Sequence, residues 1–97
     1  MLFTVNKSPL TTNHLESCLR IAPKGSPILL YEDGVYGAAK ATRVSSVVTA
    51  ALADHPVYAL RADLEARGVR SLLPEVQVID YEGFVELVEQ HDVAPWL

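Results

Sequence analysis

Cys18 is the only cysteine of the chain, and its thiol is the group best suited to covalent chemistry. A reactive thiol needs access to solvent and a lowered pKa, which a helix N-terminus or a nearby cation can provide. Cys18 lies instead about a turn and a half into the helical pattern of NHLESCLRIAP (13–23). It shares one apolar stripe with Leu15, Leu19 and Ala22, the position of a small buried hydrophobic residue. The spacing therefore favours packing over chemistry for this thiol.

Two acids and one polar pair are the next candidates. Asp33, directly before a glycine, could be a catalytic acid or a phosphate acceptor, and Asp80 precedes a helical pattern. Capping of a turn or helix is the more common role of Asp at such positions, and we interpret both residues in this way. Lys7 and Ser8 could bind an anion or anchor a partner, although Ser8 followed by Pro9 also forms an ordinary turn after a strand. Both interpretations of this pair stay open.

The remaining residue types give no catalytic set. The three histidines have no Ser or Cys partner at an informative spacing, and we interpret them as surface or capping residues: His14, His55 and His91. Neither the glycine pattern of dinucleotide-binding sites nor that of phosphate-binding P-loops occurs. A single cysteine provides neither a disulfide nor a Cys/His zinc site. We expect no cofactor and no metal.

Charge is unevenly distributed along the chain. Residues 1–48 contain five Lys/Arg and three Asp/Glu, whereas residues 49–97 contain three and nine. An acidic chain without a basic stripe is a poor candidate for binding nucleic acid. MLFTVN has no basic segment before an apolar run, and no apolar stretch approaches the roughly 18 residues of a membrane span. We therefore expect a cytoplasmic protein with no direct nucleic-acid or membrane partner.

Four short apolar runs predict the strands that position these residues. They are rich in β-forming residues and largely continuous, as in strands buried on both faces of a parallel sheet, and they cover 2–5, 27–32, 56–60 and 76–80. Helical patterns fill the gaps, at 13–22, 44–52 and 81–91, with a shorter turn or helix at 62–68, while residues 34–41 stay open between loop and helix. This alternation predicts an α/β fold: one domain, residues 1–97, with a single open, mainly parallel sheet of four to five strands and helices on both faces.

Several residues set the expected boundaries and faces of the helices. Asn13 and Glu16 have the spacing of a capping box, and Gly68 suits the position after a helix. In the last helix one side is apolar and the opposite side acidic. We expect Phe84, Val85, Leu87 and Val88 to face inward and Glu82, Glu86 and Glu89 to face solvent.

Four segments, taken together, resemble the DsrH/TusB family of sulfur-relay proteins. They follow one another with matching spacing over essentially the whole chain: MLFTVNKSP (1–9), LLYEDGVYGA (29–38), VYALRADLEARGV (57–69) and VIDYEGFVELVEQHDVAPWL (78–97). The stretch LESCLRIA (15–22) is more similar to the DsrH branch of sulfur-oxidising bacteria than to the TusB branch of tRNA thiolation. The resemblance thus favours a DsrH-like protein.

The resemblance implies a place in a larger complex. Such proteins are the smallest subunit of an α2β2γ2 heterohexamer, here with DsrE-like and DsrF-like partners, that passes persulfide sulfur to a DsrC/TusE-like acceptor. The main sulfur-carrying cysteine belongs to the DsrE-type subunit, and Cys18 matches the single cysteine of DsrH-type subunits, a second candidate carrier. Whether this chain is itself an enzyme stays open. The alternatives are a TusB-like subunit of a tRNA 2-thiouridine relay, a self-sufficient persulfide carrier using Cys18, and a free-standing small-molecule binding module.

Two further expectations concern burial and assembly. We expect the sulfur of Cys18 to be buried and to accept sulfur far less readily than the DsrE-type partner. Trp96 follows the last helical pattern, where a small domain has little core left to bury its ring, and exposed Trp is a common interface anchor. We therefore expect Trp96, Pro95 and Leu97 to lie at a subunit contact. The acidic second half of the chain predicts a complementary surface on the partner.

Overall fold

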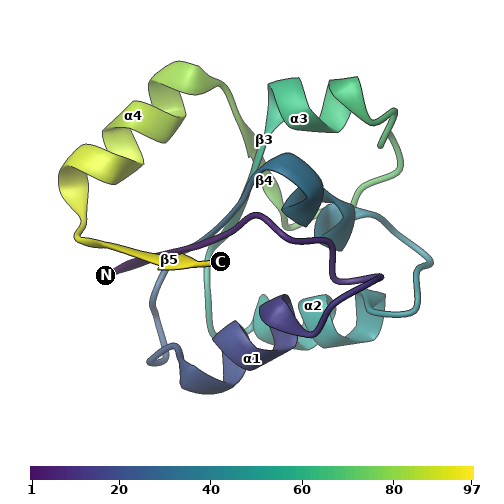
Figure 1. The fold of residues 1–97 in the computed structure, drawn as a ribbon, viewed down its shortest axis with the longest axis horizontal. Coiled ribbons are helices and arrows are strands. Elements are labelled where there is room, and N and C mark those ends of the chain that lie inside the picture. The colour runs from purple at the N-terminus through teal and green to yellow at the C-terminus, as the bar shows by residue number, and fades with distance from the viewer.

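The computed structural model describes all of residues 1–97 and contains one sheet of five parallel strands (Figure 1). The strands are β1 (Leu2–Val5), β2 (Ile28–Leu30), β3 (Val57–Leu60), β4 (Gln77–Ile79) and β5 (Val93–Trp96). Their spatial order is β4-β3-β2-β1-β5. The predicted open parallel sheet is confirmed, and four of its strands coincide with the four apolar runs.

Helices occupy each connection between strands. They are α1 (His14–Ile21), the 3-10 helix η1 (Glu32–Ala38), α2 (Ser45–Ala51), α3 (Arg61–Ala66) and α4 (Tyr81–Gln90). The four predicted helices are all present, and η1 shows that most of the segment left open by the sequence is helical. None of these helices is long and apolar enough to cross a membrane.

The two faces of the sheet are covered unequally. Because side chains alternate along a strand, the neighbours Leu29 and Leu30 point to opposite faces. Leu30 belongs to a cluster of 14 buried residues to which α1, η1, α2 and α3 all contribute, and we call this side the four-helix face. Leu29 belongs to a cluster of three with Leu2 and Leu87, beneath α4, and we call this side the α4 face. Figure 1 shows α4 on one side of the sheet and α1 and α2 on the other.

The residues expected at helix ends behave differently from one another. The Asp80 carboxylate accepts a hydrogen bond from the Gly83 N–H at 2.9 Å, so its capping role is confirmed. Gly68 follows α3 with φ of +66°, a conformation that glycine adopts without strain. The capping box at Asn13 is wrong, since its side chain makes no cap hydrogen bond. Its backbone, at φ −104° and ψ 17°, is not extended as a capping residue requires.

The inward side of α4 is narrower than the sequence predicts. Leu87 is buried and Phe84 is half-buried, but Val85 and Val88 are 51% and 38% exposed. The expectation that all four face inward is therefore wrong. Their apolar arc is wider than one side of a sheet covers, so part of it is left in solvent.

Candidate functional site

The sheet has one point at which the order of its strands reverses. The chain moves from β1 outward to β4, and α4 then carries it across to β5 on the other side of β1. Open α/β sheets bind ligands outside the carboxyl ends of the strands at such a point. Asn6, Lys7 and Ser8 follow β1 there, and Leu97 follows β5. The topology thus places the Lys7–Ser8 pair and the Trp96 segment at the carboxyl ends of adjacent strands.

The loop after β1 is held mainly by its own turn. The Ser8 carbonyl accepts hydrogen bonds from the N–H groups of Thr11 and Thr12, at 3.3 and 3.0 Å. The Ser8 hydroxyl oxygen accepts one from the Leu10 N–H at 3.2 Å, while Lys7 is exposed. Ser8 therefore has the turn role that was one of its two interpretations. Its O–H and the exposed Lys7 ammonium can still donate to an anion, so the other interpretation stays open.

Two buried polar atoms near this end of the sheet have no protein hydrogen-bond partner. They are Oδ1 of Asn6, directly after β1, and Nδ1 of His14, the first residue of α1. Buried polar atoms are almost always paired, so these two atoms are exceptions within this chain. The sequence analysis did not single out Asn6, because a lone Asn after a strand carries no distinctive spacing.

Cys18 lies inside the four-helix face, with 0% of its surface exposed. It shares the buried cluster with Leu15 and Ala22, and Leu19 packs against that cluster. Burial raises the pKa of the thiol from 9.0 to about 11. With that pKa, only about one thiol in ten thousand is ionised at pH 7. The predicted burial is confirmed, and in this conformation the thiol is neither ionised nor accessible.

The histidines occupy three different environments. His55 is buried, and its ring Nδ1 lies 2.8 Å from the Ser26 carbonyl oxygen. Because a carbonyl only accepts hydrogen bonds, Nδ1 carries the proton and donates it, which ties the segment before β3 to the segment before β2. The surface or capping role expected for His55 is wrong. His14 and His91 are half-buried at the start of α1 and just after α4.

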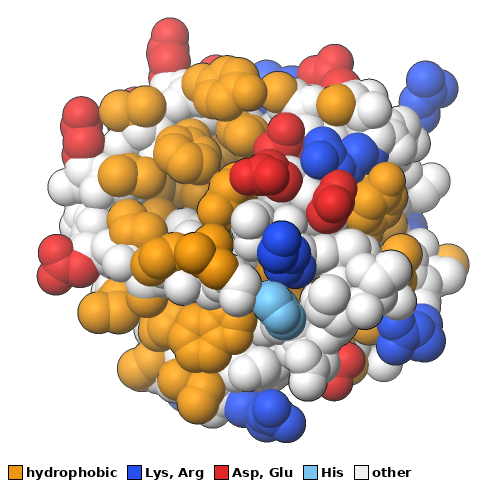
Figure 2. Space-filling view, viewed as in Figure 1, with side chains coloured by type: hydrophobic (Ala, Val, Ile, Leu, Met, Phe, Trp, Pro, Cys, Tyr) orange, Lys and Arg blue, Asp and Glu red, His pale blue; other side chains and the backbone are white.

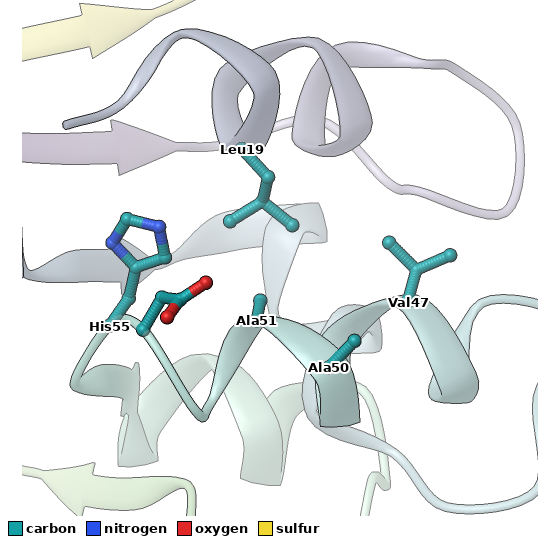
Figure 3. Close-up of a pocket in the computed structure, with 6 residues that line it drawn as sticks. Leu19, Val47, Ala50, Ala51 and His55 are labelled. Atoms are coloured by element: carbon teal, nitrogen blue, oxygen red, sulfur yellow. The ribbon is translucent and has the colours of Figure 1, made fainter. Parts of the chain in front are cut away.

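A shallow hollow of about 200 Å³ lies between α1 and α2 (Figure 3). Leu19 points into it from α1, Val47, Ala50 and Ala51 line it from α2, and Asp54 and His55 follow at one end. The Asp54 carboxylate is already engaged with the Lys24 ammonium at 3.4 Å. Its lining is mostly apolar, and its only ionisable side chains are those of Asp54 and His55.

Asp33 takes part in an ion-pair network rather than in a cap. Its carboxylate lies 2.8 Å from Nε of Arg67, whose Nη1 lies 3.7 Å from Asp63. The hydrogen bond to Asp33 raises the pKa of the guanidinium, which is therefore charged at any working pH. Asp63 also accepts a hydrogen bond at 2.7 Å from the backbone N–H of Glu32, which has φ of +47°. The capping role expected for Asp33 is wrong, because this network engages its carboxylate in joining η1 to α3.

Arg67 was missed by the sequence analysis. Its spacing of four residues from Asp63 within a helical pattern is a recognised pairing signal. Its partner Asp33 lies 34 residues away and has no such signal.

Trp96 packs against a side chain of its own domain. Residues 93–96 form β5, in which Val5 of β1 is the neighbour of Trp96. The indole packs against Phe3 with ring centroids 6.1 Å apart and an angle of 59° between the rings. The premise that little core is left for this ring is therefore wrong, because the fifth strand extends the core. Pro95 and Leu97 remain exposed, Leu97 at 71%.

This chain is similar to known proteins in its sequence and in its fold. Protein TusB of Serratia proteamaculans is 39% identical over 93 residues, covering 94% of both chains. Protein TusB of Photorhabdus laumondii is 34% identical over 99 residues, covering 99% of this chain and all of the relative. The crystal structure of the ychN protein from Escherichia coli has a TM-score of 0.76 over 97% of both chains, at 16% identity. This last likeness concerns the fold alone.

The family model for DsrH-like proteins matches residues 7–94, nearly the whole chain. The match includes the turn after β1, Cys18, the network between η1 and α3, and all of α4. The resemblance seen in the sequence is thereby confirmed, and this protein belongs to the DsrH-like family.

Proposed function

We propose that this chain is a TusB-type, non-carrier subunit of a cytoplasmic sulfur relay. One observation carries the proposal: the only thiol of the chain is fully buried, with its pKa raised to about 11. A relay subunit of this kind supplies structure and contact surface, and the sulfur is carried by a cysteine of a partner chain.

The chemistry of sulfur transfer explains why burial decides the role. A thiolate attacks the outer sulfur of a persulfide, R–S–SH, forms a new S–S bond, and releases the donor as its thiolate R–S⁻. The acceptor must therefore be ionised and reachable by a second protein. Cys18 meets neither condition in the isolated chain, which argues against a self-sufficient persulfide carrier.

The relatives bear on which relay this is. Proteins named TusB match over nearly the full length, whereas the sulfur-oxidation branch was favoured by the stretch around Cys18 alone. Since Cys18 packs in the core, its presence is weak support for a sulfur-carrying DsrH subunit. We therefore place the chain in the tRNA 2-thiouridine relay, with TusC- and TusD-type partners and a TusE-like acceptor, and we keep the DsrEFH assignment as the second candidate.

A contact at residues 95–97 remains part of the proposal. β5 is an edge strand, so one side of its backbone is free to meet another chain. Leu97, at 71% exposed, follows it directly. Deleting residues 94–97 would remove most of β5 and damage the fold, so Leu97→Asp is the sharper variant. We expect it to weaken assembly in an α2β2γ2 complex while leaving the isolated chain folded.

The test of the function combines assembly and sulfur loading. The chain is co-expressed with the TusC- and TusD-type chains of the same genome, and the mass of the complex is measured. The purified complex is then treated with a sulfane donor, and each chain is weighed by mass spectrometry. We expect one added sulfur on the TusD-type chain, none on this chain, and the same transfer rate in the matched Cys18→Ala complex. Rapid stoichiometric loading of Cys18, or loss of transfer in Cys18→Ala, would contradict the proposal.

A further inference from the structure

α4 presents an apolar surface that its own chain does not cover. At about 100° per residue, Leu87 and Phe84 lie on the side that faces the sheet, and Val88, Tyr81 and Val85 follow next around the helix. Tyr81, Val85 and Val88 are 63%, 51% and 38% exposed. We call these three residues the α4 stripe. They occupy positions i, i+4 and i+7 and so form one continuous row along the helix.

Acidic residues border the α4 stripe on the side away from the sheet. Glu89, Glu82 and Glu86 come next around the helix after Val85, and all three are exposed. α4 contains no Lys or Arg, and residues 71–97 contain six Asp/Glu and no Lys/Arg. Figure 2 shows hydrophobic side chains gathered over α4 and β5 with acidic ones at the outer margin, whereas both signs of charge mix over η1 and α3.

This charge pattern selects among possible occupants. A second copy that docks through the same helix brings only further carboxylates to the interface, and like charges brought together there weaken association. A partner with Lys or Arg beside its own apolar residues would bind more tightly for two reasons. Its apolar residues bury the α4 stripe, and its cations pair with the row of glutamates. The observations therefore favour a different chain over a second copy.

We propose that the α4 stripe is a docking surface for one of the related relay chains, and that this partner presents an apolar surface flanked by Lys or Arg. The inference rests on the proposed function, which supplies the partner chains. It adds a second contact surface, on the α4 face, separate from the one at residues 95–97. The small core beneath α4 fits this role, since a partner would bury the α4 stripe, which the single chain leaves exposed.

The test compares matched variants in binding to the co-expressed TusC- and TusD-type chains. Val85→Glu combined with Val88→Glu places two negative charges on the α4 stripe. Ile21→Glu places one such charge on an exposed apolar residue of α1, 62% exposed. We expect the double variant to weaken binding at least about 100-fold, because substitutions at the centre of an interface have the largest effects. We expect Ile21→Glu to change binding less than about threefold. Circular dichroism and the thermal midpoint of each isolated variant verify folding.

Charge reversal tests the partner's chemistry separately. Glu86→Lys with Glu89→Lys, near the C-terminal end of α4 where cations suit the helix dipole, should weaken binding about tenfold at low salt and much less at high salt. Glu65→Lys on α3 is the control and should have little effect. This pair of variants also decides the matter if the Val85/Val88 variant does not fold.

The outcomes separate the two proposals. Failure of the wild-type chain to bind either partner chain contradicts the proposed function, and the inference falls with it. Wild-type binding that survives every α4 variant overturns the inference and leaves the function standing. A homodimer of the isolated chain that Val85→Glu abolishes would identify a second copy as the occupant, which also overturns the inference.

Discussion

The four-helix face and the α4 face are two sides of one sheet, yet their buried cores differ in size. The first buries a cluster of 14 residues beneath four helices, and the second buries three residues beneath one. The lone cysteine lies in the larger core, where it is fully buried. The α4 stripe lies on the α4 face, where the buried core is small. In this small chain the larger core therefore lies on the four-helix face, and the α4 face is the side that keeps apolar residues exposed, which is why we propose it for docking.

The largest expected effect tests the difference between the two cores directly. Leu29 and Leu30 are adjacent, each is 0% exposed, and they point to opposite faces. We expect Leu30→Ala to lower the free energy of unfolding by about 4 kcal/mol and Leu29→Ala by about 2 kcal/mol, because a single helix can move inward to fill its cavity more easily. Urea unfolding of both variants measures this. Equal losses would show that the α4 face is packed as firmly as the other.

The next effect concerns the pH dependence contributed by Cys18. Its folded pKa of about 11 exceeds the value of 9.0 expected without burial, so the unfolded state loses its proton first as pH rises. The contribution of the buried, protonated thiol to stability is therefore fully present below pH 9. It falls as the pH rises toward 11, and about 2 kcal/mol of it is lost at pH 10.5.

Urea unfolding of the wild type and of Cys18→Ala between pH 7 and pH 10.5 isolates this contribution. The difference in stability between the two chains should shrink steadily above pH 9. A constant difference would mean that the thiol is accessible in the folded state, and Cys18 would again be a candidate carrier.

A smaller effect is expected where η1 joins α3, at the margin of the four-helix face. Asp63→Ala removes both the acceptor of the Glu32 N–H and one partner of Arg67, and should cost about 1–2 kcal/mol. Asp63→Asn keeps an acceptor oxygen and should cost less. Thermal unfolding gives the order of the two variants. If both were neutral, η1 would be held by its packing alone.

The smallest effect has the opposite sign. Val85 lies on the exposed side of α4 and is itself 51% exposed, and Ala has the higher helix propensity. We expect the isolated Val85→Ala chain to gain up to about 0.5 kcal/mol while its binding to the relay partners weakens. Denaturant unfolding and a binding titration on the same preparation measure both changes. A destabilised isolated chain would place Val85 in the core after all.

Most of the fold follows from local patterns in the sequence. Continuous apolar runs predict β1 to β4, and 3.6-residue periodicity predicts α1 to α4. The pattern misses β5 because Pro95 interrupts it, and proline in a strand is tolerated here only because β5 lies at the edge of the sheet. The burial of Cys18 follows from its stripe.

The failures involve partners distant in the chain. No local spacing links Asp33 to Arg67 or His55 to Ser26, since 34 and 29 residues separate them. The pattern of α4 cannot say which of its apolar residues the sheet covers and which stay exposed, so it predicts Val85 and Val88 to face inward with the others. Local patterns thus predict the helices, the strands and the burial of Cys18, but not the long-range pairs or the α4 stripe.

The pairing of β5 with β1 joins the two neighbouring strands that lie farthest apart in the sequence. Val93 to Trp96 follow their neighbours Leu2 to Val5 by about ninety residues. Until β5 pairs with it, β1 is an open edge, able to pair with a strand of another chain. Variants that weaken β5, such as Trp96→Ala, should therefore reveal themselves first as aggregation at high protein concentration.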